Sequence, residues 1–203
     1  MMPSSVDLRL PLCLLWLAGC AAGCGKTPVA GTVDYSQANS VSALLENPVK
    51  EKGLHLVEAG KTNRTVATTL GGMKCRQLKH RGHYGYIPFR IDPSFKRQGL
   101  TNVLVTVDYF DSSLGELDIE YDARESDTPD RGGKKSVRLV VYQHGEYTPT
   151  EEKSYLKKSQ QWEQAKFHLT NVRFENSQDG NADFRLRISA SEFNLRQISL
   201  QIE

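Results

Sequence analysis

The chain has 203 residues, and its 26 basic and 24 acidic side chains give a formal net charge of +2 at pH 7. Such a balanced charge argues against nucleic acid as a partner, because binding to phosphates draws on a strong local excess of positive charge. The length suits a single folded domain with a substantial hydrophobic core.

The N-terminal segment has the composition of a secretion signal. An uncharged, mostly apolar stretch runs from residue 10 to residue 25, which is shorter than the roughly 20 residues of a spanning helix. It contains Leu17-Ala18-Gly19-Cys20, which resembles the lipobox of bacterial lipoproteins. The resemblance implies removal of residues 1–19, lipidation of Cys20, and attachment to a membrane of the bacterial cell envelope, facing outside the cytoplasm. The alternative is ordinary signal cleavage, which would release a soluble protein.

Residues 20–52 have the composition of a tether. Gly, Pro, Ser, Ala and Asn dominate the segment up to Ser42, as in flexible connections. Val41, Leu44 and Leu45 are candidates for the start of a short helix, which Pro48 would end.

From Gly53 onward, apolar residues alternate with polar ones, which is typical of strands that bury one face. The clearest pair is Val103–Tyr109 and Leu117–Tyr121, separated by the turn-forming residues 111–115, and we predict a hairpin there. The segment 84–91 is also predicted to be a strand, with Pro88 placing it at an edge or a bulge. About nine or ten such strands and almost no helical period predict an all-β, antiparallel β-sandwich over residues 53–203.

The order of short segments along residues 53–203 carries a second resemblance. The segments are Gly71-Gly72 with Arg76, then 86–92, 103–111, Tyr121-Asp122, Trp162, 171–174 and 181–186. This succession resembles galactose-binding-like jelly rolls, the sandwich of many carbohydrate-binding modules and of domains appended to bacterial polysaccharide-degrading proteins. It implies a jelly-roll fold and binding of carbohydrate. The chain departs from that pattern at Pro88, where those proteins favour an aromatic residue, and in its long, charged segment 124–155.

Sugar binding requires flat aromatic rings for the apolar face of a pyranose and polar groups for its hydroxyls. The candidate ligand-binding residues are Trp162, Tyr147, Tyr155, Tyr84 and Arg76. Each has an alternative structural role. Trp162 would start a strand and pack on the sandwich, the tyrosines at 147 and 155 would fold over a sheet edge, and Arg76 would pair with a carboxylate.

The family resemblance also allows a structural calcium ion, because jelly rolls of this kind often hold one through carboxylates and backbone carbonyls. The candidate donors are Asp92, Asp108, Asp111 and Asp122, which form no recognisable loop motif. His80 and His83 alone offer too few ligands for zinc. The sequence indicates no other cofactor.

The sequence predicts a binding protein rather than an enzyme. Glu116, Asp118 and Glu120 form a row expected on the solvated face of a strand, whereas glycosidases need two carboxylates across a cleft. We therefore expect a membrane-anchored, non-catalytic lipoprotein that recognises carbohydrate. One alternative is a structural or assembly subunit of a cell-envelope protein complex. Another is a small polysaccharide lyase or hydrolase that uses the row of acids.

Overall fold

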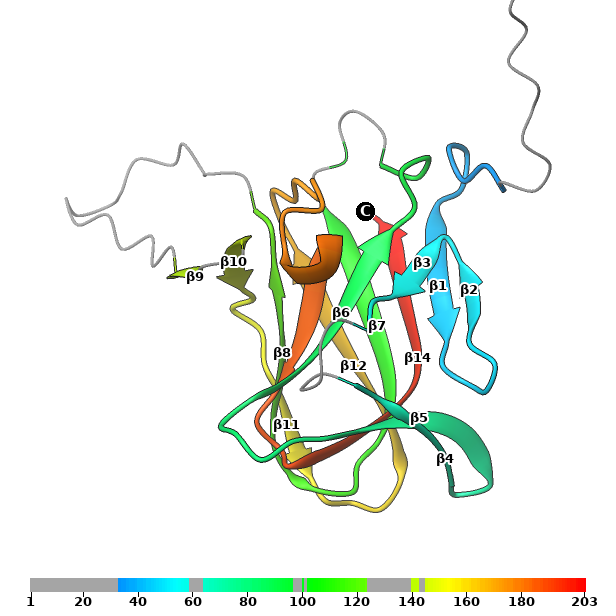
Figure 1. Cartoon of the computed structure of the whole chain (residues 1–203), viewed down its shortest axis with the longest axis vertical. Coiled ribbons are helices and arrows are strands. Elements are labelled where there is room, and N and C mark those ends of the chain that lie inside the picture. The colour runs from blue at the N-terminus through cyan, green and yellow to red at the C-terminus, as the bar shows by residue number, and fades with distance from the viewer. Residues whose placement is uncertain (1–32, 59–63, 97–99, 101, 124–139, 143–144) are drawn as a thin grey trace, which may run out of the picture. The chain divides into compact units, whose positions relative to one another are not determined.

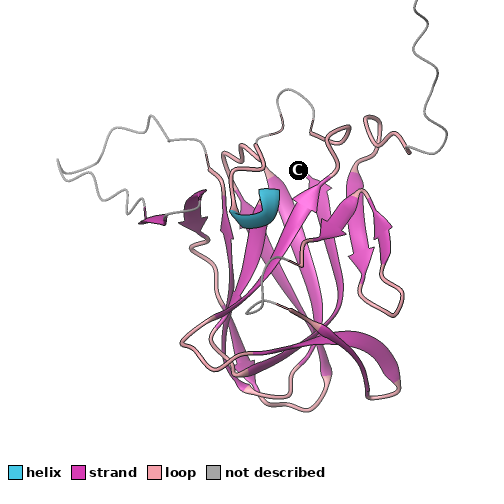
Figure 2. Cartoon of the chain, in the orientation of Figure 1, coloured by secondary structure: helices cyan, strands magenta, loops and turns pink. Residues whose placement is uncertain are grey.

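A computed structural model describes residues 33–58, 64–96, 100, 102–123, 140–142 and 145–203 (Figure 1). Within these ranges the chain forms strands and one short 3₁₀ turn, Asp179–Asn181 (η1), with no α-helix (Figure 2). Two antiparallel sheets pack together, so the predicted all-β sandwich is confirmed. No helix in the described ranges has the length and hydrophobicity to cross a membrane.

The first sheet, sheet A, is organised around its longest strand, β14. In spatial order its strands are β12 (Trp162–Leu169), β7 (Val103–Phe110), β14 (Glu192–Ile202), β1 (Ser40–Leu44) and β2 (Lys50–Lys52), with β5 (Met73–Lys79) and β4 (Val66–Leu70) attached as a hairpin. One side of β14 pairs with β7, and the other side pairs first with β5 and then with β1. Strand β14 therefore joins the hairpins β4–β5 and β1–β2 to the rest of the sheet.

The second sheet, sheet B, contains the strands that carry most of the predicted site residues. In spatial order they are β3 (Leu54–Leu56), β6 (Gly85–Ile91), β13 (Phe184–Ile188), β8 (Leu114–Tyr121), β10 (Gly145–Pro149) and β9 (Val140–Tyr142), with β11 (Ser154–Lys157) paired to the first half of β8. The two central strands of the sheet are thus β13 and β8.

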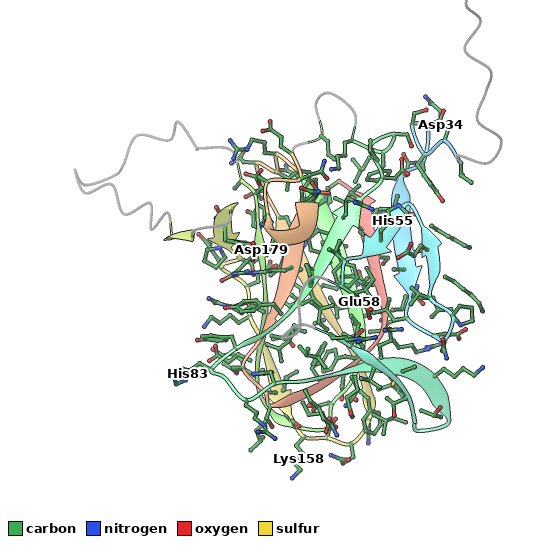
Figure 3. The ribbon with its side chains drawn as sticks, viewed as in Figure 1. Asp34, His55, Glu58, His83, Lys158 and Asp179 are labelled. Atoms are coloured by element: carbon green, nitrogen blue, oxygen red, sulfur yellow. The ribbon has the colours of Figure 1, made fainter. Side chains whose placement is uncertain are left out.

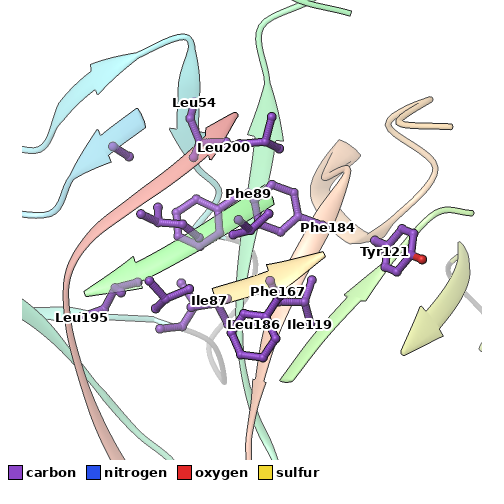
Figure 4. Packing of buried hydrophobic residues seen from close by; sticks show 14 of the residues in the cluster. Leu54, Ile87, Phe89, Ile119, Tyr121, Phe167, Phe184, Leu186, Leu195 and Leu200 are labelled. Carbon is purple, nitrogen blue, oxygen red and sulfur yellow. The ribbon is translucent and has the colours of Figure 1, made fainter. Parts of the chain in front are cut away.

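The hydrophobic core lies between the sheets and includes the alternating stripes that the sequence predicted, together with Val41, Ala43 and Leu45 from the segment predicted as a tether. Phe89 and Phe184 stack with ring centroids 5.5 Å apart (Figure 4). Tyr109 stacks on Phe193 with ring centroids 5.4 Å apart. The stripes with at least two buried members are Val103, Val105 and Val107; Ala165, Phe167 and Leu169; Leu117 and Ile119; Phe184, Leu186 and Ile188; Ile198 and Leu200.

The predicted hairpin is wrong, although both of its strands exist. Strand β7 pairs with β12 and β14 in sheet A, whereas β8 pairs with β13 in sheet B. The short connection 111–113 therefore crosses from one sheet to the other. Period-two alternation shows which face of a strand is buried, but it does not show which strand lies beside it.

The prediction of a tether through residue 52 and of a helix near residue 41 is also wrong. Strand β1 pairs with β14 from Ser40 opposite Gln201 to Leu44 opposite Gln197. Val41, Ala43 and Leu45 point into the core, and a compact unit begins at residue 33. Five residues are too few to distinguish a helix from a strand by periodicity. Residues 1–32, including Cys20, lie outside the described ranges.

The edge position predicted from Pro88 holds for only part of the strand, because β6 lies between β3 and β13 and pairs with β3 from Phe89 to Ile91. The Pro88 carbonyl oxygen accepts a hydrogen bond from the Val57 amide at 2.9 Å, just beyond the end of β3. The absent proline N–H therefore falls where the pairing between β3 and β6 stops. Of the long, charged segment 124–155 noted in the sequence, residues 124–139 and 143–144 lie outside the described ranges.

Gly115, near the start of β8, permits a close approach of two backbones. A Cβ atom at this position would lie 2.7 Å from the Ala190 nitrogen and 2.9 Å from its Cα. We expect Gly115→Ala to lower the free energy of unfolding by about 1–3 kcal/mol, because backbone cannot move aside as a side chain can. Urea denaturation followed by circular dichroism measures this. Gly82→Ala is the control, since its nearest atom would be 3.8 Å away; equal stability of the two variants would contradict the prediction.

Candidate functional site

The outer face of sheet B, which points away from the core, carries three parallel rows of side chains. Directly opposed residues of antiparallel strands share a face. The rows follow from the strand register, continued one residue beyond the paired ends of β6, β13 and β11 to reach Tyr84, Ser189 and Lys153. The first contains Tyr84, Ser189, Glu116 and Tyr155; the second Tyr86, Arg187, Asp118 and Lys153; the third Pro88, Arg185, Glu120 and Pro149. We call the first of these the tyrosine row.

The second and third rows contain a buried network of opposite charges. Arg185 binds Glu120 through its Nε at 2.7 Å and its Nη2 at 2.5 Å. Arg187 binds Asp118 through its Nε at 2.8 Å and also reaches Glu120 at 3.1 Å. The hydrogen bond to Asp118 raises the pKa of Arg187. Asp118 is 2% exposed and Glu120 is 3% exposed, so the predicted solvated row of acids is wrong at these two positions.

Tyrosine rings cover part of this network. The Arg185 guanidinium lies 3.9 Å from the centroid of the Tyr86 ring and 3.5 Å from that of Tyr147. The Tyr147 hydroxyl accepts a hydrogen bond from the Asp179 amide at 3.3 Å, and burial raises the pKa of Tyr147. At 2% exposure Tyr147 offers no surface to a ligand, so its predicted contact with a ligand is not supported. The alternative, in which its ring folds over the sheet, is supported.

The tyrosine row is open. Tyr155 is 62% exposed and Tyr84 is 45% exposed, and they stand at its two ends. Three strand spacings separate them, or roughly 14 Å. Between them the Ser189 hydroxyl accepts a hydrogen bond from the Glu116 amide at 2.7 Å. The Glu116 carboxylate binds Lys153 at 2.7 Å, and this hydrogen bond raises the pKa of Lys153. The arrangement is two exposed aromatic rings with a low, polar floor between them.

Beside Tyr155, the loop 157–161 is held by the buried carboxylate of Asp111. That carboxylate accepts hydrogen bonds from the amides of Lys157 at 3.1 Å and Ser159 at 2.9 Å. Lys158 and Gln160 have left-handed backbone with φ of 60° and 58°. Burial acts to raise the pKa of Asp111, but the backbone hydrogen bonds outweigh it and lower that pKa. The loop therefore has a fixed backbone.

Two predicted site residues lie elsewhere and have structural roles. Trp162 begins β12 and packs edge-on against Phe110 with ring centroids 5.4 Å apart. Its indole Nε1 is buried beside Gly71 and has no hydrogen-bond acceptor among the described residues. Arg76 pairs with Glu58, and its side chain is 14% exposed. For both residues the structural alternative is confirmed.

The four carboxylates predicted as calcium donors are each bound by separate protein donors. Asp122 is fully buried and accepts hydrogen bonds from Arg173 and Ser177. Asp108 accepts one from Gln164, Asp111 binds the loop amides described above, and Asp92 binds Ser94. Across the described ranges, no group of three or more His, Cys, Asp or Glu side chains is arranged to hold a metal ion.

A pocket of about 590 Å³ that sequence reasoning missed lies beside the end of β6. Its lining residues are His55, Arg90, Asp92, Pro93, Glu175, Asn176 and Asn181. Lys96 supports it by binding both Asp183 at 2.8 Å and Asn176 at 2.7 Å. The signal in the sequence was the recurrence of asparagine at 171, 176 and 181, since asparagine tolerates left-handed backbone and all three residues adopt it. The pocket is lined by no Phe, Tyr or Trp side chain among the described residues, unlike the tyrosine row.

Comparison of the chain with protein-family models and with curated proteins finds no match. Function is therefore inferred from the described side chains and the N-terminal motif.

We expect Asp111→Asn to lower the free energy of unfolding at pH 7 by about 1–3 kcal/mol, because the loop amides lose a charged acceptor. Folding lowers the pKa of Asp111 from its ordinary value of 3.8. Its carboxylate therefore stabilises the fold above that value, and the stabilisation is lost as the pH falls through the folded pKa. The difference between wild type and variant should shrink below pH 3.8.

Urea denaturation at neutral and acidic pH measures this difference. Asp108→Asn is the matched control, because Asp108 binds only the exposed Gln164 amide among the described residues. A difference for Asp111→Asn that stays constant with pH would refute the assigned role.

Proposed function

We propose that this chain is a non-catalytic, carbohydrate-binding lipoprotein of the bacterial cell envelope, anchored through Cys20, and that its ligand lies along the tyrosine row. The observation that carries the proposal is the pair of exposed rings, Tyr84 and Tyr155, at the two ends of one polar row. A tyrosine ring offers an apolar face to the C–H face of a pyranose and a hydroxyl to its polar edge. The separation of the two rings suits a chain of sugars better than a single ring.

The rigidity of the row supports this function. The Arg187 guanidinium lies 5.0 Å from the centroid of the Tyr84 ring and is itself fixed by Asp118. Tyr155 stands on β11, which is paired along its whole length with β8. Ordered side chains lose little conformational entropy when a ligand binds, so more of the contact energy appears as affinity.

The state of the acids supports binding rather than catalysis. Asp118 and Glu120 are buried in ion pairs with arginines, and Glu116 is paired with Lys153. Glycoside hydrolysis needs one carboxyl group that holds a proton and a second that faces it across the sugar. Glu116, Asp118 and Glu120 offer no such pair, because each is held in an ion pair.

The two seven-stranded antiparallel sheets, with the order of segments noted in the sequence, support assignment to the galactose-binding-like jelly rolls. The motif Leu17-Ala18-Gly19-Cys20 supports the lipid anchor. Because two or three acyl chains bury many methylene groups, at about 0.8 kcal/mol each, such an anchor would be stable.

Tyr84→Ala and Tyr155→Ala should each weaken binding to the recognised polysaccharide by about tenfold, the effect expected when a central aromatic contact is removed. Affinity gel electrophoresis against a broad panel of polysaccharides measures the retardation of each variant. Val66→Ala is the control, since Val66, at 64%, is about as exposed as Tyr155 but lies on the β4–β5 hairpin of sheet A. Failure of the wild-type protein to bind any member of the panel would refute the proposal.

Cys20→Ala should abolish incorporation of radiolabelled palmitate and should move the protein out of the membrane fraction of a bacterial host, because the acylated thiol is removed. Cys75→Ala is the matched control, because Cys75 is a buried thiol within β5. Membrane association that persists without label would contradict the anchor. A stoichiometric protein partner that retains the variant at the membrane would favour the assembly-subunit alternative.

A further inference from the structure

We infer that the ligand of the tyrosine row is an anionic polysaccharide, one that bears carboxylate or sulfate groups, rather than a neutral one. This inference rests on the proposed function of the same row and specifies its ligand class. It is carried by the distribution of charge around the two exposed tyrosines.

Exposed cations flank both ends of the row. Lys157 lies two residues after Tyr155 on β11, so both side chains leave the same face of the strand. Lys158 follows it, and Arg81 lies in the exposed loop just before Tyr84. In Figure 3, His83 of that loop and Lys158 both lie in the lower part of the view. We call Arg81, Lys157 and Lys158 the cationic rim.

The charged groups of the cationic rim form no ion pair within the described part of the chain, although the buried Asp111 carboxylate lies under the backbone of Lys157. No described carboxylate lies within 4.0 Å of their charged groups, since none forms a salt bridge. The neighbouring acids have other partners. Glu116 binds Lys153, Glu192 binds Lys79, and Glu163 accepts a hydrogen bond from the Ser159 hydroxyl. The rim therefore keeps a local positive potential on a chain of nearly balanced charge.

The backbone beneath the rim is fixed, so this potential has a fixed position. The buried Asp111 carboxylate binds the amide of Lys157, and Lys158 is held in left-handed backbone at a φ of 60°. Two lysines therefore emerge beside Tyr155 from a loop that cannot easily reorient. A sugar ring stacked on Tyr155 would bring its ring substituents close to these ammonium groups.

An anionic bilayer is the other partner that cations and exposed apolar groups attract, and Leu114, opposite Lys157, is 70% exposed. The shape of the row favours the polysaccharide. The two rings are separated by Ser189 and the ion-paired Glu116, whereas insertion into a membrane calls for a continuous apolar patch.

The test uses the full chain carrying Cys20→Ala, so that no acyl group contributes. Affinity electrophoresis compares polygalacturonate and dextran sulfate with neutral dextran and galactomannan, at low and high salt. We expect retardation by an anionic polymer that weakens with salt. The triple variant Arg81→Ala, Lys157→Ala, Lys158→Ala should lose about tenfold in affinity. The matched control is Arg64→Ala, Lys74→Ala, Lys166→Ala, which removes three exposed cations elsewhere and should bind normally.

The outcomes separate the two levels of the proposal. Retardation by only one anionic polymer supports the inference and identifies the group recognised. Binding to neutral polymers that depends on Tyr84 and Tyr155 but not on the cationic rim would overturn the inference and leave the proposed function standing. Binding to anionic polymers that does not depend on Tyr84 and Tyr155 would be simple ion exchange and would overturn the inference. Association with phosphatidylglycerol vesicles and with no polysaccharide would overturn it in favour of a membrane surface.

Discussion

The outer face of sheet B depends on the pairing of Arg185 and Arg187 with Asp118 and Glu120. Four charges lie on adjacent strands, three of them (Asp118, Glu120 and Arg185) are buried, and each carboxylate oxygen faces a guanidinium. Removing one partner of such a pair would leave a buried charge uncompensated, at about 3–5 kcal/mol. The network therefore ties β13 to β8, and the planar guanidinium of Arg185 gives the rings of Tyr86 and Tyr147 a surface to stack on.

This network divides the tyrosines of the face into two kinds. Towards the third row, Tyr147 is buried over Arg185 and held by η1, so it seals the ion pairs from water. Along the tyrosine row, by contrast, the described residues provide no such cover, and the rings of Tyr84 and Tyr155 are exposed to solvent. The same residue type thus serves the stability of the sheet at one end and remains available to a partner at the other. The position of each tyrosine in the strand register decides whether it is buried or exposed.

Alternation along single strands could be predicted from the sequence, because one face of each strand is buried in the core. It gave the inward stripes of β7, β8 and β13 correctly. Pairing could not be predicted, since the neighbours of β7 and β8 are distant in the chain. Asp118 looked solvated for the same reason, because its arginine partner lies 69 residues away. Of the predicted aromatic residues, Tyr84 and Tyr155 are exposed and Tyr147 is buried over Arg185, whereas Trp162 is half-buried and packs against Phe110. Only the fold creates the contacts of Tyr147 and Trp162.

Strand β14 joins β7, β5 and β1 in one sheet. Along the chain, β1 lies near the start of the compact unit that begins at residue 33, whereas β14 lies at its end. Sheet A therefore lacks its central strand until the chain is available through residue 202. The contacts between residues most distant in the sequence form last. A polypeptide that emerges on the far side of a membrane with its N-terminal part first would have to wait for its final strand before this sheet could close. For the exported lipoprotein that we propose, such delayed closure would keep the chain unfolded, and so able to be threaded, during export.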